Sequence, residues 1–409
     1  MLGSGDDSQF AYQSMWQRER KMTAYPRRIL DLFGIEVPVI QAPMLGVSTS
    51  AMVVAVAEAG GLGSLPLSNL SPEGARRVFS EIRRQTSKPI NVNFLCHEAA
   101  KCNPVRDTAW LESLQAYYAE LRVDSGIPPL DNLIQTFGDA HCDVIEDIKP
   151  EVVSFHFGLP AKHLLDGVRR SGAKIMSSAT TVEEASWLEE AGCDAIIAQG
   201  FEAGGHRGTF LNGNIDAQVG TMALVPQICD AVRVPVIAAG GIGDPRGVAA
   251  AFALGASAVQ VGTSFLFCDE ANISPLYRRA LRIAQSGQTV ITNVFTGRMA
   301  RALETRIVRE LGRIANNVPE FPLAATALAP LRAASELHGS TDFTPLWCGQ
   351  AVCLSPELPA AKLTAWLCDA FVQTSQSPSD ISASKRYLQG IGPESSSNPS
   401  PKGGAVEDC

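Results

Sequence analysis

The sequence predicts an α/β fold, a (β/α)8 barrel of the TIM type with a smaller, mainly helical C-terminal addition. Short apolar runs alternate eight times with helical segments over about 230 residues. The runs are apolar throughout, which is typical of parallel strands that are buried on both faces. Eight such units favour a closed barrel, and an open doubly wound sheet is the alternative fold.

Composition limits the classes of function. The chain has 409 residues, of which 45% are hydrophobic and 19% charged, and its formal net charge is −8. A negative net charge without a Lys/Arg cluster argues against nucleic-acid binding. No apolar run of about 18 residues is present, so no membrane span is expected. The ten cysteines have neither CxxC nor metal-ligand spacing, so we expect reduced thiols and a cytoplasmic protein.

The N-terminal half begins with a polar leader, residues 1–25, that lacks the apolar segment of a secretory signal. The Ala/Val-rich helix expected at 50–59 ends at two glycines, and the helix from Ser71 to about Gln85 begins with Ser-Pro-Glu. Another helix ends at Ile148. The expected strands are Val37–Met44, Leu62–Leu67, Pro89–Cys96 and Val152–Phe157.

The second half of the barrel repeats the same alternation. The helix expected at 181–191 has Thr180 or Thr181 as its cap and acidic residues in its first turn. Further helices are expected at 161–170, 217–232 and 245–254. The expected strands are Lys174–Ala179, Ala195–Gln199, Pro235–Gly240 and Ala258–Gly262.

The barrel is therefore assigned to residues 26–270, with an insertion at 97–140. This insertion contains a helix at 110–121, and its length is typical of a lid or a subunit contact. A small helical subdomain is expected at 271–370, with helices at 274–286 and 302–314 and a strand and turn between them. Residues 371–409 are rich in Ser, Pro and Gly and are expected to be a disordered tail.

Glycines and amides follow the last two strands, where TIM barrels bind phosphate. Gly240 and Gly241 follow the seventh strand, and the run Gln260, Val261, Gly262 and Thr263 ends the eighth. Glycine is needed where a Cβ would block the approach of the anion to backbone N–H groups. We favour phosphate binding over the alternative of two ordinary tight turns.

Amide side chains at other strand ends suggest which phosphorylated ligand binds. Asn93 and Gln199 suit the nitrogen and oxygen atoms at the edge of a flavin ring, and backbone up to Met44 could flank that ring. These residues suggest flavin mononucleotide (FMN). Other phosphorylated ligands use the same kind of site, so this alternative stays open.

His206 is the candidate catalytic base. It lies in the loop after the sixth strand, beside Gly204 and Gly205, which let backbone approach a ligand closely. An imidazole has a pKa near neutrality, which suits proton transfer. The alternative is a loop histidine bonded to a backbone carbonyl. His156, between two phenylalanines, is better interpreted as a satisfied strand histidine, and no metal cluster is evident.

The flanking Glu202 and Arg207 either orient this loop or face water.

These motifs resemble those of the nitronate monooxygenase family, formerly called 2-nitropropane dioxygenases. The resemblance covers about 35–267, with a looser continuation to about 352. The motifs that carry it are Gln41–Met44, Asn91–Asn93, Ser154–Gly158, Glu202–Gly208, Ala238–Ile242 and Gln260–Thr263. Phe201 departs from it, because relatives often carry a smaller or polar residue there.

The resemblance implies a TIM barrel that holds FMN without a covalent bond and has His206 as its base. It implies oxidation of alkyl nitronates, and of nitroalkanes where the base first removes a proton, by O2 to a carbonyl compound and nitrite. The partners would be this small-molecule substrate and O2. Only the resemblance suggests a homodimer.

Two other functions remain open. FMN-dependent enoyl-acyl-carrier-protein reductases and quinone reductases share the barrel and a Gly-Gly-His loop but use NAD(P)H; the Arg after His206 favours the monooxygenase. The other alternative is a catalytically silent barrel that binds a phosphorylated ligand or acts in assembly. Polar residues gathered at the strand ends argue against the silent barrel.

Overall fold

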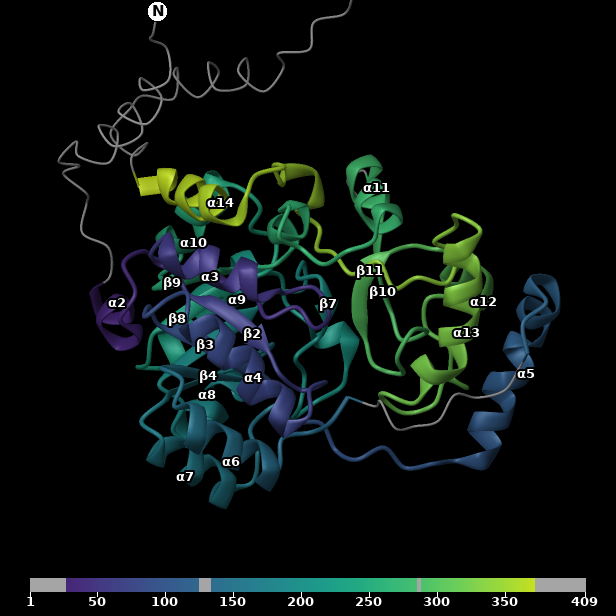
Figure 1. Ribbon diagram of the computed structural model, residues 1–409, viewed down its shortest axis with the longest axis horizontal. Helices are drawn as coiled ribbons and strands as arrows, with labels where there is room; N and C mark the ends of the chain where they lie inside the picture. Colours follow the sequence, from purple (N-terminus) through teal and green to yellow (C-terminus); the bar gives the residue numbers. More distant parts are fainter. Residues whose placement is uncertain (1–26, 125–133, 285–287, 372–409) are drawn as a thin grey trace, which may run out of the picture. The chain divides into compact units, whose positions relative to one another are not determined.

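The protein is built around an eight-stranded parallel barrel, which Figure 1 shows with its surrounding helices. A computed structural model describes residues 27–124, 134–284 and 288–371. The strands follow the order β1-β9-β8-β6-β5-β4-β3-β2. The ends of this sheet meet through a parallel bridge between Ile40 and Leu62, and the backbone N–H of Leu62 donates to the carbonyl of Val39 at 2.9 Å. The predicted barrel is confirmed, and the open sheet is wrong.

The barrel strands are β1 (Val39–Gln41), β2 (Gly63–Pro66), β3 (Ile90–Leu95), β4 (Val152–His156), β5 (Lys174–Ala179), β6 (Ala195–Gln199), β8 (Val236–Ala239) and β9 (Ala258–Val261). The helices on its outside are α3 (Ser50–Glu58), α4 (Pro72–Arg83), α6 (Asp139–Ile148), α7 (Lys162–Arg170), α8 (Val182–Glu190), α9 (Thr221–Ala231) and α10 (Pro245–Ala253). Thr181 caps α8, since its hydroxyl accepts from the N–H of Glu184 at 3.2 Å. The helix expected from residue 217 begins only at Thr221, after the 3-10 turn η2 (Ile215–Ala217).

Two apolar clusters show which end of the barrel is filled and which end is open. One fills the shell between strands and helices, and the other fills the interior of the barrel at one end. Helix α2 (Arg27–Phe33) adds Ile29 and Phe33 to the interior cluster. Because α2 covers this end, the free space of the barrel lies at the carboxyl ends of its strands.

The C-terminal addition is mainly helical, as expected, but is organised on a small sheet. Its helices are α11 (Pro275–Ile283), α12 (Arg306–Leu311) and α13 (Ala324–Leu337). The sheet has the order β10-β11-β7, formed by Thr289–Thr292, Ala300–Leu303 and Gly205–His206. The expected helix 302–314 is wrong at its start, because Ala302 and Leu303 belong to β11, where they pair with Val290 and Thr289.

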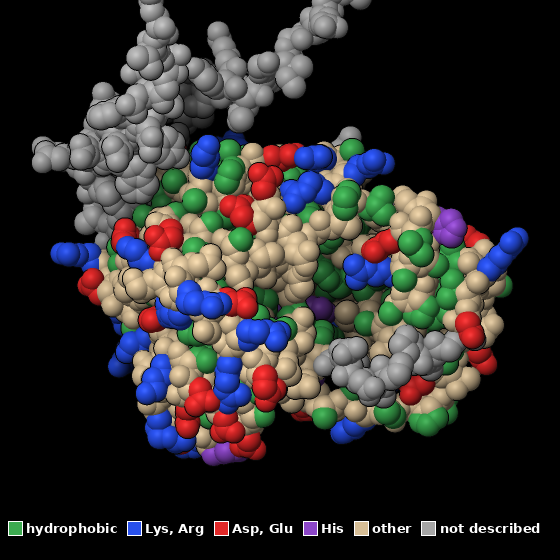
Figure 2. Space-filling model, viewed as in Figure 1, with side chains coloured by type: hydrophobic (Ala, Val, Ile, Leu, Met, Phe, Trp, Pro, Cys, Tyr) green, Lys and Arg blue, Asp and Glu red, His purple; other side chains and the backbone are tan. Residues whose placement is uncertain are grey.

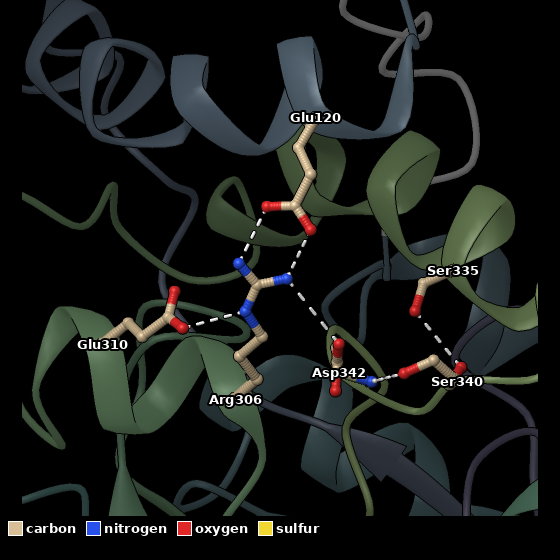
Figure 3. Close-up of polar contacts among 6 residues, drawn as sticks. All are labelled: Glu120, Arg306, Glu310, Ser335, Ser340 and Asp342. Carbon is tan, nitrogen blue, oxygen red and sulfur yellow. Dashed lines mark hydrogen bonds and ion pairs between the residues drawn. The ribbon is translucent and has the colours of Figure 1, made fainter.

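Segments distant in sequence complete this addition. Helix α5 (Pro104–Leu121), from the insertion, packs Trp110 and Leu114 into an apolar cluster with Leu328 and Leu331 of α13. Arg306 of α12 bonds both carboxylate oxygens of Glu120 on α5, at 2.6 and 2.8 Å (Figure 3). The insertion therefore forms part of the addition.

The chain then returns to the barrel. Helix α14 (Ala360–Leu367) places Ala360, Leu363 and Leu367 in the cluster around the barrel and lies beside α3 and α10 (Figure 1). The short 3-10 turns are η3 (Thr263–Phe267), η4 (Val352–Leu354) and η5 (Cys368–Phe371). The expected leader and the expected tail beyond Phe371 lie outside the described residues.

None of the described cysteines is in a disulfide. No described helix is long and apolar enough to cross a bilayer.

Candidate active site

A cavity of about 500 Å³ lies at the carboxyl ends of the barrel strands and reaches under the C-terminal addition. The molecule is visibly hollowed between these two parts (Figure 2). The candidate residues that line the cavity are Met44, Asn93, Gln199, Gly204, Gly205, His206, Gly240, Gly241, Gln260, Gly262 and Thr263. The structure thus brings together residues that are up to about 220 positions apart in the sequence.

Val261 does not line this cavity. Its side chain is buried in the apolar shell around the barrel, whereas its neighbours Gln260 and Gly262 face the cavity. The reason is the alternation of a strand, in which successive side chains point to opposite faces. The prediction took the run 260–263 as a block and so included one outward-facing residue.

The amide side chains that line the cavity differ in their hydrogen-bond partners. Both ends of the Gln199 amide hold the following loop: Nε2 donates to the carbonyl of His206 at 3.0 Å, and Oε1 accepts from the N–H of Gly208 at 2.8 Å. Nδ2 of Asn93 donates to Oγ of Ser154 at 2.9 Å. Oε1 of Gln260 is buried and has no partner among the described residues. An unpaired buried acceptor is costly, so it marks a position where a ligand donor fits.

The glycines of these loops lie so close to neighbouring backbone atoms that a Cβ at the same positions would collide with them. Gly240 has φ +103°, and a Cβ there would lie 2.9 Å from the backbone nitrogen of Ala203. A Cβ on Gly204 would lie 2.5 Å from the backbone nitrogen of Gly349, and that N–H donates to Oγ1 of Thr263 at 2.8 Å. A segment of the addition therefore closes over the loops predicted to bind phosphate.

His206 lies where the barrel meets the addition. Its Nε2 is 2.9 Å from Oγ1 of Thr296, and its backbone pairs with Ala300 of β11. The ring lies edge-on to Phe321 and tilted against Trp347, and its half-buried surface faces the cavity. Burial is the main cause that lowers the pKa of His206 to about 3. Neutral pH therefore leaves this imidazole uncharged and able to accept a proton.

His156 also borders the cavity but is satisfied, as predicted. Its Nδ1 is 3.0 Å from Oγ of Ser178, and its Nε2 is 3.3 Å from the carbonyl of His206. Burial, then the charge of Arg298, lowers the pKa of His156 to about 3. His156 thus supports the loop that carries His206.

Comparisons with known proteins match this chain over most of its length. The model of the family described as nitronate monooxygenase matches residues 27–370. A nitronate monooxygenase of Pseudomonas aeruginosa is 41% identical over 341 residues, which are 82% of this chain and 96% of that protein. One of Paraburkholderia phytofirmans is 42% identical over 348 residues, 83% and 94% of the respective chains.

The chain belongs to the nitronate monooxygenase family.

A solved structure agrees with this assignment. The nitroalkane oxidase of Streptomyces ansochromogenes superposes with a TM-score of 0.77 at 36% identity, and the match covers 85% of this chain and 98% of that one. The family resemblance inferred from the motifs is therefore confirmed, together with the barrel fold and an enzyme of this type.

Glu202 and Arg207, which flank the glycine loop, bond to neighbouring residues of the protein. Arg207 is 1% exposed and donates to the carbonyls of Gly200 and Gln199 at 2.7 and 2.8 Å. The Glu202 carboxylate accepts from both the N–H and the hydroxyl of Thr221 at 2.8 Å. Both side chains therefore hold the loop in shape.

Phe201, the departure from the family pattern, does not border the cavity. Arg301 lies over its ring at 4.8 Å and donates to its carbonyl at 2.8 Å. Its larger side chain therefore serves the contact between this loop and β11.

Sequence reasoning missed the cavity residues that come from the addition. They are Ile134, Tyr277, Phe295, Thr296, Ala325, Leu328, Ala329, Arg332, Phe343, Pro345, Trp347, Cys348, Gly349 and Ala351. The other candidates were found because they lie at the carboxyl ends of barrel strands. None of these residues follows a barrel strand, so the same rule could not identify them. Within the described residues, no group of His, Cys, Asp and Glu side chains is suited to hold a metal ion.

Proposed function

We propose that this protein oxidises alkyl nitronates with O2 to a carbonyl compound and nitrite, using FMN. The observation that carries the proposal is an uncharged imidazole, His206, in a cavity whose barrel wall consists of glycines and amides. Membership of the nitronate monooxygenase family supports the same reaction.

The chain's own residues fit FMN. Gln260 offers a buried Oε1 to which no described residue donates, and this acceptor suits an N–H at the edge of a flavin ring. Gly240 and Gly241 have φ of +103° and +72°, a backbone conformation that favours glycine, and both line the cavity. We assign Gly240, Gly241, Gly262 and Thr263 to the phosphate group.

We assign the flavin ring to the other lining residues, which are Met44, Asn93, Gln199, Gly204, Gly205 and Gln260. A bound flavin supplies the redox chemistry, since it takes electrons from the substrate and returns them to O2.

In this proposal His206 handles the proton. A nitronate has already lost its α proton and needs no base. A neutral nitroalkane gives this proton to Nδ1 of His206, because Nε2 is held by Thr296 at 2.9 Å. The low pKa of His206 makes it a weak base, so the reaction favours the nitronate over the nitroalkane.

The addition keeps water from the reacting atoms. Phe321 and Trp347 lie against the His206 ring, with ring centroids 5.2 and 5.3 Å from its own. Excluding water from this side strengthens the electrostatic interaction between the imidazole and an anionic substrate.

The first test is the visible spectrum of the purified protein and its response to two reductants. A nitronate should reduce the flavin without O2 and release nitrite with O2. Flavin reduction by NADH instead of nitronate would favour the reductase. A colourless protein that does not take up FMN would contradict both.

The predicted division into 26–270 and 271–370, the homodimer and the cytoplasmic location remain separate proposals. Analytical ultracentrifugation of the holoprotein tests the dimer.

A further inference from the structure

The wall of the cavity that the C-terminal addition forms is largely apolar. Arg332 is the only acidic or basic residue (Asp, Glu, Lys or Arg) among the described residues that line the cavity. Its side chain is 46% exposed, and its Nε donates to Glu336 at 2.8 Å. Arg332 therefore lies at the rim, paired with a carboxylate, and places no free cation inside the cavity.

Helix α13 forms much of this wall. Ala325, Leu328, Ala329 and Arg332 all line the cavity, and their spacing places them along one face of the helix. Ala325 is half-buried, Leu328 is 4% exposed and Ala329 is exposed. The face therefore runs from the interior of the cavity to its rim.

The residues around this face are apolar as well. Phe295, Phe343 and Pro345 line the same cavity, and Phe343 is 1% exposed. Tyr277 also lines it, but its hydroxyl donates to the carbonyl of Trp347 at 2.6 Å. No polar group on these side chains is left to bind a charged substrate tail.

Ala325 and Ala329 lie one helical turn apart. Their small side chains leave space that a larger side chain at either position would fill. An alkyl chain is the ligand that such a wall binds best, because each buried methylene adds a favourable transfer free energy. A charged tail would lose its hydration without gaining a partner.

We propose that the face of α13 formed by Ala325, Leu328 and Ala329 binds the alkyl chain of the substrate. The enzyme would then prefer nitronates with long, uncharged chains over short ones and over those with a terminal carboxylate. This inference rests on the proposed function, whose substrate class it narrows.

The test is the dependence of kcat/KM on chain length, measured on the holoenzyme with straight-chain nitronates from nitroethane to 1-nitrooctane. We expect kcat/KM to rise about fourfold per methylene, the equivalent of about 0.8 kcal/mol. The nitronate of 3-nitropropionate should be poorer than that of 1-nitrobutane. A flat dependence, or a preference for the carboxylate, would overturn the inference.

Two variants test whether the dependence of kcat/KM on chain length arises at α13. Ala325→Leu should abolish the rise of kcat/KM with chain length, and Ala329→Leu should end the rise only at longer chains, because it fills the cavity nearer its rim. Ala333→Leu is the matched control, because Ala333 is an exposed residue of the same helix that does not line the cavity. If Ala325→Leu and Ala329→Leu retain the wild-type dependence, α13 does not bind the chain.

A binding measurement separates this inference from the proposed function. Straight-chain carboxylates have a planar anionic head like that of a nitronate and cannot be oxidised in this way. Calorimetry should show their Kd decreasing with chain length in the wild type and not in Ala325→Leu. Such a trend without nitronate oxidation would refute the proposed function alone, and oxidation without the trend would refute only the chain-binding face.

Discussion

The two walls of the cavity differ in chemistry and in how the sequence encodes them. The barrel wall consists of glycines and amides such as Gly240 and Gln260, each at the end of a parallel strand. The wall from the addition consists of apolar side chains such as Leu328 and Phe343. A ligand with many polar atoms suits the first wall, and an uncharged alkyl chain suits the second. In the proposed function, two parts of the chain share one cavity, the barrel wall for binding the cofactor and the wall of the addition for selecting the substrate.

Replacing the base should have the largest effect on catalysis. His206→Asn should lower nitroalkane turnover by about 10²–10⁴-fold, since a positioned general base contributes on this order. Nitronate turnover should fall far less, because this substrate needs no deprotonation, and FMN should stay bound. The measurement is kcat/KM for a nitroalkane and its nitronate at one pH. Equal loss of both activities would contradict the assigned role.

Acid should destabilise the protein through the two histidines whose pKa values the fold lowers. His156 and His206 have pKa values lowered to about 3 from 6.5, so between these values the unfolded chain binds more protons than the folded one. Stability is then complete above pH 6.5 and is lost as the pH falls towards 3, by roughly 1.4 kcal/mol per pH unit for each histidine.

Urea unfolding at pH 7 and pH 5 measures this loss. His156→Gln should reduce the dependence on pH, whereas His163→Gln, which removes an exposed histidine of α7, is the control. A wild-type protein equally stable at both pH values would contradict the burial argument.

Removing the hydroxyl that the addition offers to the base should have a smaller effect. Thr296→Val deletes the 2.9 Å contact with Nε2 of His206 and should lower nitroalkane kcat/KM about three- to tenfold, the value of one hydrogen bond. Thr296→Ser keeps a hydroxyl and should restore the activity. If serine fails to rescue, the loss comes from packing instead of from orientation of the imidazole.

The smallest effect should come from the ion pairs that join α5 to α12. Glu120→Gln removes one partner of Arg306, which keeps Glu310 at 2.8 Å (Figure 3). Partly exposed pairs contribute little, so we expect only a small loss of stability and unchanged kcat/KM. Thermal unfolding and steady-state kinetics check this. A larger loss would mean that the ion pairs, and not the apolar cluster, hold the wall in place.

The sequence predicted the barrel because its signals are local. Each strand from Val39–Gln41 to Ala258–Val261 is a short apolar run, and the parallel arrangement brings the residues after these runs to one end. This is why Asn93, Gln199 and Gly240 could be grouped without coordinates. The same reasoning erred at Val261, since it did not follow the alternation of side chains within the strand.

The sequence by itself determined the fold class, the glycine and amide wall and the position of His206. Only the tertiary structure decided what faces them. Thr296, Ala325 and Trp347 carry no motif and reach the cavity through the pairing of β7 with β11 and the packing of α5 on α13. The physical reason is the range of the interactions: strand and turn patterns follow from neighbouring residues, whereas this wall depends on contacts between segments about 90 to 200 residues apart.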